Sequence, residues 1–343
     1  QSMDKIKIAV PICNRTNYTK LKKILGILNA NQSIDVGAIV SSSLLISRKT
    51  SGIQDIIDDG VKIVREIDVL MMNDSLEAMS KTSGMSLIEH ATFLHDFKPD
   101  MVLIVGDRFD MMPAALAAKM CGIPIYHIQG GERSGSIDDT VRDIISICAD
   151  RHYVATEKAR EYVERITFSE NVFNFGCPSV EMLHDYDVGD FLDVKTFKKR
   201  YRNSFGIAPN ENYILVAAHP NTDDEYDMDM GALLGAVLSF GLKTVVMRPN
   251  IDAYNQHIAD AIREFKNDVV VVRHMPVEDF VKLMAHASCM VGNSSSGIRE
   301  ASSFGTPVVN VGNRQAFRER NINVTDVPCT YEEVHKGIGL ALA

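Results

Sequence analysis

The sequence has no long apolar run and only six cysteines among its 343 residues. No stretch of eighteen apolar residues occurs, and the first residues lack the basic-then-apolar layout of a signal peptide, so we expect no membrane partner. The cysteines show no metal-ligand spacing and most lie in apolar runs: Cys13, Cys121, Cys148, Cys177, Cys289 and Cys329. We therefore expect reduced core thiols, no bound metal and a cytoplasmic protein.

The chain also has fewer basic residues than acidic ones. Thirty-six basic residues against forty-five acidic ones give a net charge of −9, which disfavours nucleic acid as a partner. An anionic ligand would have to be held by local groups. The chain lacks a GxGxxG turn after its first apolar run, so we expect neither NAD nor any other cofactor.

What is present is an ordinary globular composition, 45% hydrophobic and 24% charged, at a length that suits two domains. Short runs rich in valine and isoleucine alternate with amphipathic stretches, which predicts parallel strands and helices. In the first half the predicted strands are 6–10, 36–40, 101–105, 123–128, 152–155 and 172–175. The helices between them are predicted at 18–28, 85–95, 111–120 and 140–147.

A second series of strands is predicted at 213–217, 244–247, 269–272, 289–292 and 307–311. The segment 176–193 breaks the apolar periodicity and carries several aspartates, which is typical of a linker. We predict an α/β protein of two Rossmann-like, doubly wound domains, an N-terminal one over 3–182 and a C-terminal one over 183–343.

Polar residues follow six of the predicted strands. Ligands bind beyond the carboxyl ends of parallel strands, so these residues are expected to face one groove between the domains. They are Asn14 and Arg15, then 106–108 and 129–132, and in the second half His219, Asn250 and 293–296.

The stretch GNSSSGIREA over 292–301 places hydroxyl side chains where a strand turns into a helix. Ser294 and Ser295 could grip a phosphate together with backbone N–H groups, or they could only cap a helix beginning near Gly297. Glu300, one turn into that helix, could accept ribose hydroxyls or be a surface carboxylate.

A group of acidic residues lies near position 138. Asp139 stands three residues after a serine, as in a capping box, and Asp138 with Arg142 could form an exposed i,i+4 ion pair. Together with Asp107 and Glu132 on adjacent loops, however, they supply several carboxylates for acid and base catalysis.

Histidines fall into two kinds. His127 and His152 lie at strand edges and are expected to be hydrogen-bonded core residues. His219, before a proline at a strand end, could stabilise a phosphate leaving group or could only form a structural turn.

These residues form motifs that resemble the hydrolysing UDP-N-acetylglucosamine 2-epimerases over roughly 8–324. The motifs are GDRFD (106–110), HIQGGERSGSIDDTVR (127–142), HP (219–220), RPNIDA (248–253) and GNSSSGIREASSFGTPVVNVGNRQ (292–315). The resemblance implies a glycosyltransferase-B-like fold with its active site in the interdomain cleft. It also implies a UDP-sugar as partner and a homodimer or homotetramer.

Motif matching carries the family's roles onto this sequence. The implied UDP contacts are Arg15, Thr19, Arg108, His219, Asn250, Ser294, Ser295, Glu300 and Arg314. The implied catalytic positions are Asp107, Gln129 and Asp138, with Glu132, Asp139, Arg142 and His219 as further candidates. The implied reaction is anti elimination of UDP to 2-acetamidoglucal, followed by addition of water to give N-acetylmannosamine.

Three departures from the family pattern stand out. Gln129 replaces the usual glutamate, and an amide cannot exchange a proton in that role. Lower activity, a different substrate or a proton route through Glu132 would each follow from this change. Asp143 replaces a histidine, and a terminal helix expected from the family would lie beyond Ala343.

Three alternatives therefore remain beside UDP-N-acetylglucosamine 2-epimerisation. The first is the same chemistry on UDP-2,4-diacetamido-2,4,6-trideoxyglucose. The second is a UDP-sugar binder with little turnover, suggested by Gln129. The third is a glycosyltransferase, because the fold alone does not exclude transfer.

Overall fold

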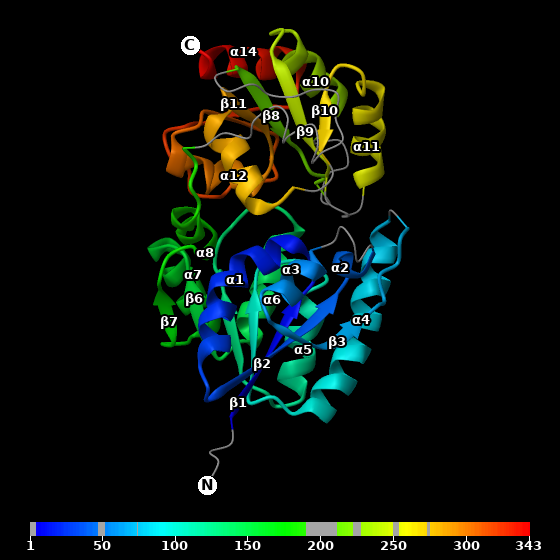
Figure 1. Cartoon of the computed structure of the whole chain (residues 1–343), viewed down its shortest axis with the longest axis vertical. Helices are drawn as coiled ribbons and strands as arrows, with labels where there is room; N and C mark the ends of the chain where they lie inside the picture. The colour runs from blue at the N-terminus through cyan, green and yellow to red at the C-terminus, as the bar shows by residue number, and fades with distance from the viewer. Residues whose placement is uncertain are drawn as a thin grey trace. The chain divides into compact units, whose positions relative to one another are not determined.

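The computed structural model of the protein describes residues 5–46, 52–73, 75–189, 211–221, 228–249, 254–272 and 275–343. The chain divides into two compact units. Unit 1 comprises 1–132 and 137–182, and unit 2 comprises 133–136 and 183–343. Each unit is an α/β fold built around its own parallel sheet (Figure 1), so the predicted fold class is confirmed.

The sheet of unit 1 has the order β3-β2-β1-β4-β5-β6-β7. Its strands are β1 (Ile6–Ile12), β2 (Ile34–Ser41), β3 (Lys62–Ile67), β4 (Met101–Val105), β5 (Ile125–Ile128), β6 (Arg151–Val154) and β7 (Val172–Asn174). β1 pairs with both β2 and β4, and the strand order reverses there. The connections after β1 and β4 therefore leave the sheet toward opposite faces, and in sheets of this kind ligands bind at the carboxyl ends where this reversal occurs.

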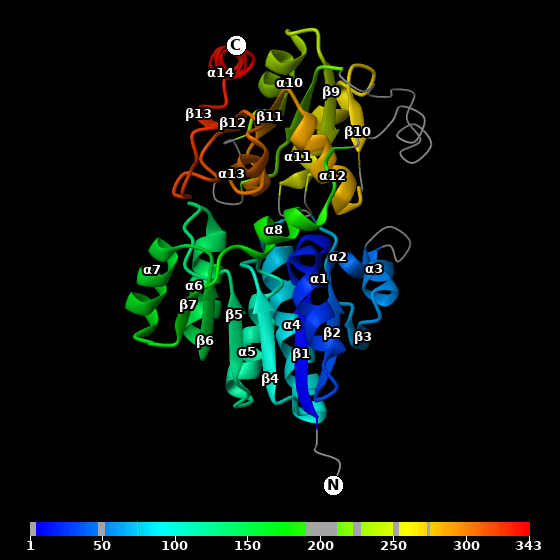
Figure 2. The same ribbon diagram turned by 60° about the vertical axis from the view of Figure 1, so that its left-hand side comes forward.

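Helices cover both faces of this sheet (Figure 2). α1 (Arg15–Ala30), α2 (Ser43–Ile46) and α3 (Ile53–Asp58) pack on one face, and α4 (Leu76–Phe97), α5 (Met112–Met120) and α6 (Ile137–Cys148) on the other. Alternate residues of β1 serve the two cores, because side chains of a strand point to opposite faces. Ile8 and Val10 belong to the α1 side and Ala9 to the α4 side. Unit 1 also contains α7 (Glu157–Thr167) and α8 (Pro178–Glu181), and η1 (Met182–Asp185) follows.

The sheet of unit 2 has the order β10-β9-β8-β11-β12-β13. Its strands are β8 (Tyr213–Ala217), β9 (Lys243–Met247), β10 (Val270–Val272), β11 (Cys289–Gly292), β12 (Val308–Val311) and β13 (Val324–Val327). One face packs against α10 (Met230–Leu238), α11 (Asn255–Glu264) and α14 (Tyr331–Ala341). The other packs against α12 (Val277–His286) and η2 (Ala301–Phe304), and α13 (Ser295–Ile298) follows β11.

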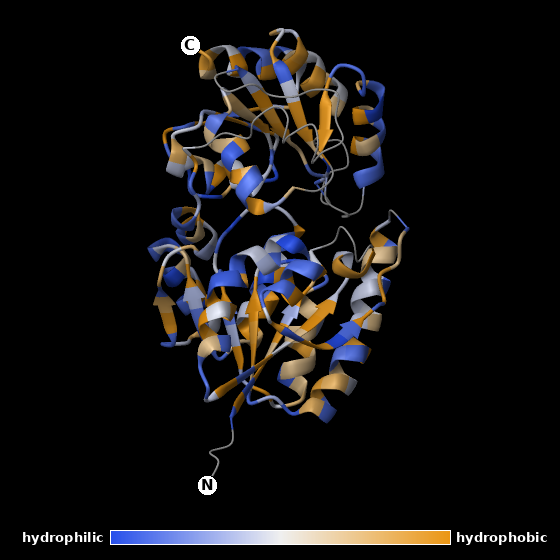
Figure 3. Cartoon of the chain, viewed as in Figure 1, coloured by the Kyte–Doolittle hydropathy of each residue, from blue (hydrophilic) through white to orange (hydrophobic). Residues whose placement is uncertain are grey.

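Most predicted strands occur within two residues of their expected bounds, and three of them match residue for residue. Two strands were not predicted, β3 and β13. Both are edge strands in which half of the residues are exposed. Polar residues interrupt them, so they lack the continuous apolar run that marks the central strands, which are orange in Figure 3. The predicted linker over 176–193 contains the short helices α8 and η1. Within the described ranges, no helix is long and apolar enough to cross a membrane.

Candidate active site

A buried arginine organises the carboxyl ends of β4 and β5 in unit 1. Arg142 on α6 is fully buried, and its Nε donates to Asp107 Oδ2 at 3.1 Å, with Nη2 donating to the same oxygen. Its Nη1 donates to Asp139 Oδ1 at 2.7 Å and to the backbone carbonyl of Glu132. The guanidinium thus fixes three separate segments of the predicted site.

The charge of Arg142 is maintained by these neighbours. Burial lowers the pKa of the guanidinium, but the carboxylates of Asp107, Glu132 and Asp139 more than offset this and raise it above its usual value. The exposed i,i+4 ion pair between Asp138 and Arg142, weighed above as the alternative to a catalytic cluster, does not form, because Arg142 has no exposed surface. Asp138 lies half-buried in the first turn of α6.

Gln129 follows β5 in an unusual backbone conformation, with φ of 66°. Its side-chain Nε2 donates to Glu132 Oε1 at 3.3 Å and to the sulfur of Cys177 at 3.2 Å. Its Oε1 is buried without a hydrogen-bond partner among the described residues. A non-glycine residue in this region is held there at a cost, which is common at functional sites.

Two histidines lie side by side on β5 and β6 beneath these residues. His127 is fully buried, and its ring nitrogens contact the Gly106 carbonyl at 2.9 Å and Ser146 Oγ at 3.0 Å. The prediction of a hydrogen-bonded core histidine is therefore confirmed for His127. It is wrong for His152, whose two buried ring nitrogens have no partner in the described part of the chain. Burial lowers the pKa of each histidine to about 4.

Asp143, which stands where the family carries histidine, is held by a tyrosine. The hydroxyl of Tyr162 on α7 donates to Asp143 Oδ2 at 2.8 Å. This hydrogen bond joins α6 to α7.

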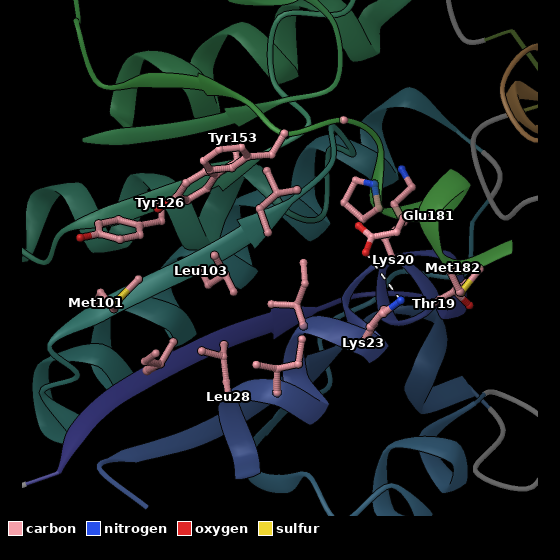
Figure 4. Close-up of a pocket in the computed structure, with 17 residues that line it drawn as sticks. Thr19, Lys20, Lys23, Leu28, Met101, Leu103, Tyr126, Tyr153, Glu181 and Met182 are labelled. Atoms are coloured by element: carbon pink, nitrogen blue, oxygen red, sulfur yellow. Dashed lines mark ion pairs between the residues drawn. The ribbon is translucent and has the colours of Figure 1, made fainter. Parts of the chain in front are cut away.

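The predicted UDP contacts of unit 1 lie around β1, α1 and β4. Arg15, the first residue of α1, pairs with Asp55 on α3 at 2.9 Å. Arg108 pairs with the buried Asp110 at 3.2 Å. Thr19 lies on α1 and lines a groove (Figure 4).

That groove is a feature the sequence did not predict. It encloses about 450 Å³ between α1 and strands β4 to β6. Leu28, Leu103 and Tyr153 line it, and an ion pair at 3.6 Å joins Lys23 and Glu181 at its rim (Figure 4). None of the predicted proton-transfer carboxylates lines it, so we do not assign it to the candidate active site.

In unit 2 a buried asparagine joins two strand ends. His219, after β8, donates its backbone N–H to Asn293 Oδ1 at 2.7 Å and accepts from Asn293 Nδ2 at 2.9 Å. Gly292 permits this approach, because a Cβ there would overlap the Ala217 carbonyl oxygen and its φ is 138°. The backbone of His219, not its ring, makes these two bonds.

The serine-rich stretch begins a very short helix. The helix starts at Ser295, not near Gly297 as predicted, and Ser294 caps it by accepting from the Ser296 N–H. The helix ends at Ile298, so Glu300 lies beyond it and not one turn inside it. One carboxylate oxygen of Glu300, Oε2, is buried without a partner in the described segments.

Two further side chains converge on the same point. Arg314 Nη1 donates to the Asn293 carbonyl at 3.3 Å and Gln315 Nε2 donates to it at 3.0 Å. His219, Ser294 and Arg314 are thus gathered around Asn293. Asn250, also predicted to contact UDP, lies outside the described residues.

Sequence reasoning missed three residues that support this site. Asp110, Cys177 and Gln315 each hold a predicted site residue or the loop that carries it. Asp110 and Gln315 lie inside quoted motifs, but their buried contacts have no local signal. Among the described residues, no group of three or more histidine, cysteine or acidic side chains is placed to hold a metal ion.

Two parallel-sheet units with polar strand ends define the class of glycosyltransferase-B-like proteins. Solved structures share this fold. The UDP-N-acetylglucosamine 2-epimerase from Neisseria meningitidis bound to UDP-GlcNAc has a TM-score of 0.78 at 19% identity and covers 97% of this chain and 90% of its own. The Methanocaldococcus jannaschii enzyme in complex with UDP-GlcNAc and UDP has a TM-score of 0.78 at 15% identity, covering 98% and 92%.

Comparisons of the sequence with a family model and with related proteins show the family of this chain. The family model described as UDP-N-acetylglucosamine 2-epimerase matches residues 33–343. The hydrolysing UDP-N,N'-diacetylbacillosamine 2-epimerase of Legionella pneumophila is 33% identical over 98% of this chain and 89% of its own length. The UDP-N-acetylglucosamine 2-epimerase of Neisseria meningitidis serogroup B is 26% identical over 89% and 79%. The chain belongs to the UDP-N-acetylglucosamine 2-epimerase family.

Proposed function

We propose that this protein is a hydrolysing UDP-sugar 2-epimerase that releases UDP and a free sugar inverted at C2. The observation that carries the proposal is the cluster around the buried Arg142, which binds the carboxylates of Asp107 and Asp139 and the backbone carbonyl of Glu132. Family membership and the hydrolysing relative at 33% identity support it.

The chemistry requires more than one proton-transfer group. In the first step the C1–O bond to UDP breaks, a carboxylate takes the C2 proton, and a C1=C2 double bond forms. In the second step water adds its hydroxyl to C1, and a proton returns to C2 from the opposite face. Because ring C2–H is barely acidic, charge on the leaving diphosphate must be stabilised early. We assign the proton transfers to Asp107 and Asp138, with Asp139 and Arg142 fixing the first of them.

The leaving group needs cations and hydrogen-bond donors. We propose that Arg15, Arg108 and His219 stabilise the diphosphate, since charge-assisted hydrogen bonds to phosphate are strong. The remaining proposed UDP contacts are Thr19, Asn250, Ser294, Ser295, Glu300 and Arg314. Glu300 Oε2, which has no hydrogen-bond partner among the residues that the structure describes, is a suitable acceptor for ribose hydroxyls.

Gln129 places an amide where the family pattern has a carboxylate. Its amide donates to Glu132 at 3.3 Å, whereas a glutamate would place a second carboxylate against the first. We propose that Gln129 orients Glu132, which is the alternative to Asp107 or Asp138 for one of the two proton transfers. The competing reading is a UDP-sugar binder with little turnover.

We base the proposed substrate on the names of the relatives, which differ from the sequence-based expectation of UDP-N-acetylglucosamine. Relatives at 33% and 27% identity are both named for N,N'-diacetylbacillosamine nucleotides. This favours UDP-2,4-diacetamido-2,4,6-trideoxyglucose over UDP-N-acetylglucosamine as the substrate.

Product analysis with both donors tests the proposal. We expect free UDP and free 2-epimeric sugar from each donor that reacts, with the higher kcat/KM for the diacetamido donor, because sugar O6 and N4 groups must find matched partners. UDP binding without product over hours would support the binder. Transfer to an added acceptor without free sugar would indicate a glycosyltransferase.

The variant Gln129→Glu separates the binder from an active enzyme. A protein that is inactive only because of Gln129 should gain turnover in this variant. If proton transfer already runs through Glu132, the variant should instead lose turnover, since two carboxylates at this distance share a proton. Glu77→Gln, which breaks an exposed ion pair with Lys81 on α4, is the control and should leave kcat unchanged.

A further inference from the structure

A buried carboxylate beside the candidate site has no part in the mechanism described above. Asp110 lies in the loop between β4 and α5 and is only 3% exposed. Ser42 Oγ donates to its Oδ2 at 2.6 Å, and Arg108 Nε donates to its Oδ1 at 3.2 Å. A buried charge is retained only where partners offset its desolvation, so the reason for Asp110 lies in these contacts.

The contacts bring together three neighbouring strands. Ser42 follows β2 with a φ of 56°, Cys13 follows β1, and Arg108 follows β4, where the strand order reverses. Burial raises the pKa of the Asp110 carboxyl. Arg108 and Ser42 lower it by more than burial raises it, so the pKa lies below its ordinary value. Burial and the Asp110 charge raise the pKa of the Cys13 thiol, so it is neutral. Asp110 is therefore the anion that neutralises Arg108.

The turn itself does not need the carboxylate. The backbone N–H groups of Met111 and Met112 both donate to the Arg108 carbonyl, at 2.9 and 3.3 Å, and close the loop. The side chain of Arg108 is 13% exposed while that of Asp110 is 2% exposed. The carboxylate thus holds the inner side of a guanidinium that still reaches the surface at the strand ends.

We propose that Asp110 is a positioning residue that fixes the Arg108 guanidinium for the diphosphate of UDP. This inference rests on the proposed function, which places Arg108 at the diphosphate. Fixing a long side chain before the ligand arrives removes the conformational entropy that binding would otherwise cost. Ser42 acts through Asp110, since its hydroxyl sets the position of the carboxylate.

Calorimetric titration with UDP tests the proposal on the full chain and on four variants: Asp110→Asn, Arg108→Ala, the double variant and Ser42→Ala. We expect the Kd for UDP to rise about tenfold or more in Asp110→Asn, because a buried hydrogen bond between charged groups is lost. In the Arg108→Ala background the same substitution should change the Kd less than twofold. Ser42→Ala should raise the Kd a few-fold. Glu89→Gln, which removes the exposed partner of Arg65, is the control and should match the wild type.

The binding stoichiometry and the melting temperature separate this role from a purely structural one. If Asp110 only stabilised the fold, Asp110→Asn would reduce the fraction of folded protein and therefore the binding stoichiometry. The reduction would be the same factor in the wild-type background and in the Arg108→Ala background. A Kd for UDP that is unchanged in Asp110→Asn would overturn the proposal. So would a double variant in which the increases in Kd of the two single variants multiply. If Asp110→Asn does not fold, Ser42→Ala decides, and a wild-type Kd in it rejects the proposal. A wild-type protein that does not bind UDP would instead reject the proposed function itself.

Discussion

Single residues of the candidate site are held by partners that are far away in the sequence. Asp107 and Arg142 are 35 positions apart, and Gln129 and Cys177 are 48 positions apart. The first pair joins the loop after β4 to helix α6, and the second joins the loop after β5 to the segment after β7. Side-chain positions at this edge therefore depend on buried polar contacts more than on local backbone structure.

Removing the buried arginine should be costly. In Arg142→Met, the buried Asp139 and the partly buried Asp107 lose their cation, which costs about 3–5 kcal/mol and lowers the Tm of unit 1 by roughly 10 °C. Arg65→Met removes an exposed arginine whose pair with Glu89 has 43% and 40% side-chain exposure. That pair contributes at most about 1 kcal/mol.

Differential scanning calorimetry compares the two variants. A Tm for Arg142→Met that falls no further than that of Arg65→Met would show that the buried cluster does not stabilise unit 1.

At the residue scale, the sequence predicted which side chains gather but not how they pair. The positions of Asp107 and Glu132 followed from strand ends, and that of Asp139 from the serine three residues before it. The choice of Asp107 and Asp139 as partners of Arg142 did not, because local spacing favours Asp138 and only the tertiary fold buries the guanidinium.

Among the elements, the paired strands β5 and β6 bring two buried histidines together. His127 and His152 are register partners. His127 has hydrogen-bond partners, whereas His152 has none in the described part of the molecule. We therefore expect the two histidines to respond differently to replacement.

His152→Leu should reduce the acid sensitivity of the protein. Burial lowers the pKa of His152 from 6.5 to about 4, so between these values the unfolded state binds a proton that the native state does not. The free energy of unfolding therefore falls as the pH falls from 6.5 to 4, by up to about 1.4 kcal/mol per unit for this group. His152→Leu should remove this slope and cost less than about 1.5 kcal/mol at pH 8.

His127→Leu is the matched comparison. It should lower stability at pH 8 as well, because it leaves the Gly106 carbonyl and Ser146 without their partner. Thermal unfolding from pH 8 to pH 4 checks both. Parallel pH curves for the wild type and His152→Leu would contradict the assignment.

The junction of β8 and β11 should tolerate no side chain at position 292. Gly292→Ala would place Cβ on the Ala217 carbonyl oxygen at a φ of 138°, so strands must separate, at a cost of about 2–4 kcal/mol. Gly26→Ala in α1 meets nothing within 4 Å and should stabilise unit 1 by about 0.5–1 kcal/mol. We expect the Tm to fall in Gly292→Ala and to rise in Gly26→Ala. A Tm that changes in the same direction in both variants would contradict this assignment.

At the element scale, the sequence predicted buried strands well and polar ones poorly. β8 and β11 are continuous apolar runs and were predicted with their observed bounds. β3 and β13 are edge strands with exposed polar residues. The serine-rich helix α13 was placed two residues late because its cap, Ser294, and its first residue, Ser295, are of the same type.

The whole molecule combines an acidic chain with basic side chains at its strand ends. The net charge is −9, yet Arg15, Arg108 and Arg314 lie at the carboxyl ends of the two sheets or beside them. Two α/β units with separate hydrophobic cores carry these groups. The fold class and the family followed from the sequence because they depend on apolar periodicity and on motifs. The substrate did not, since sugar specificity depends on the shape and partners of the bound state.

The central claim is that the sugar passes through elimination before water adds. The measurement is NMR of the free sugar formed in D₂O from whichever donor reacts, with Asp107→Asn as a control expected to lose most of its turnover. We predict complete incorporation of one deuterium at C2 in the released sugar. Release of UDP and a sugar that retains its original hydrogen at C2 would contradict the account.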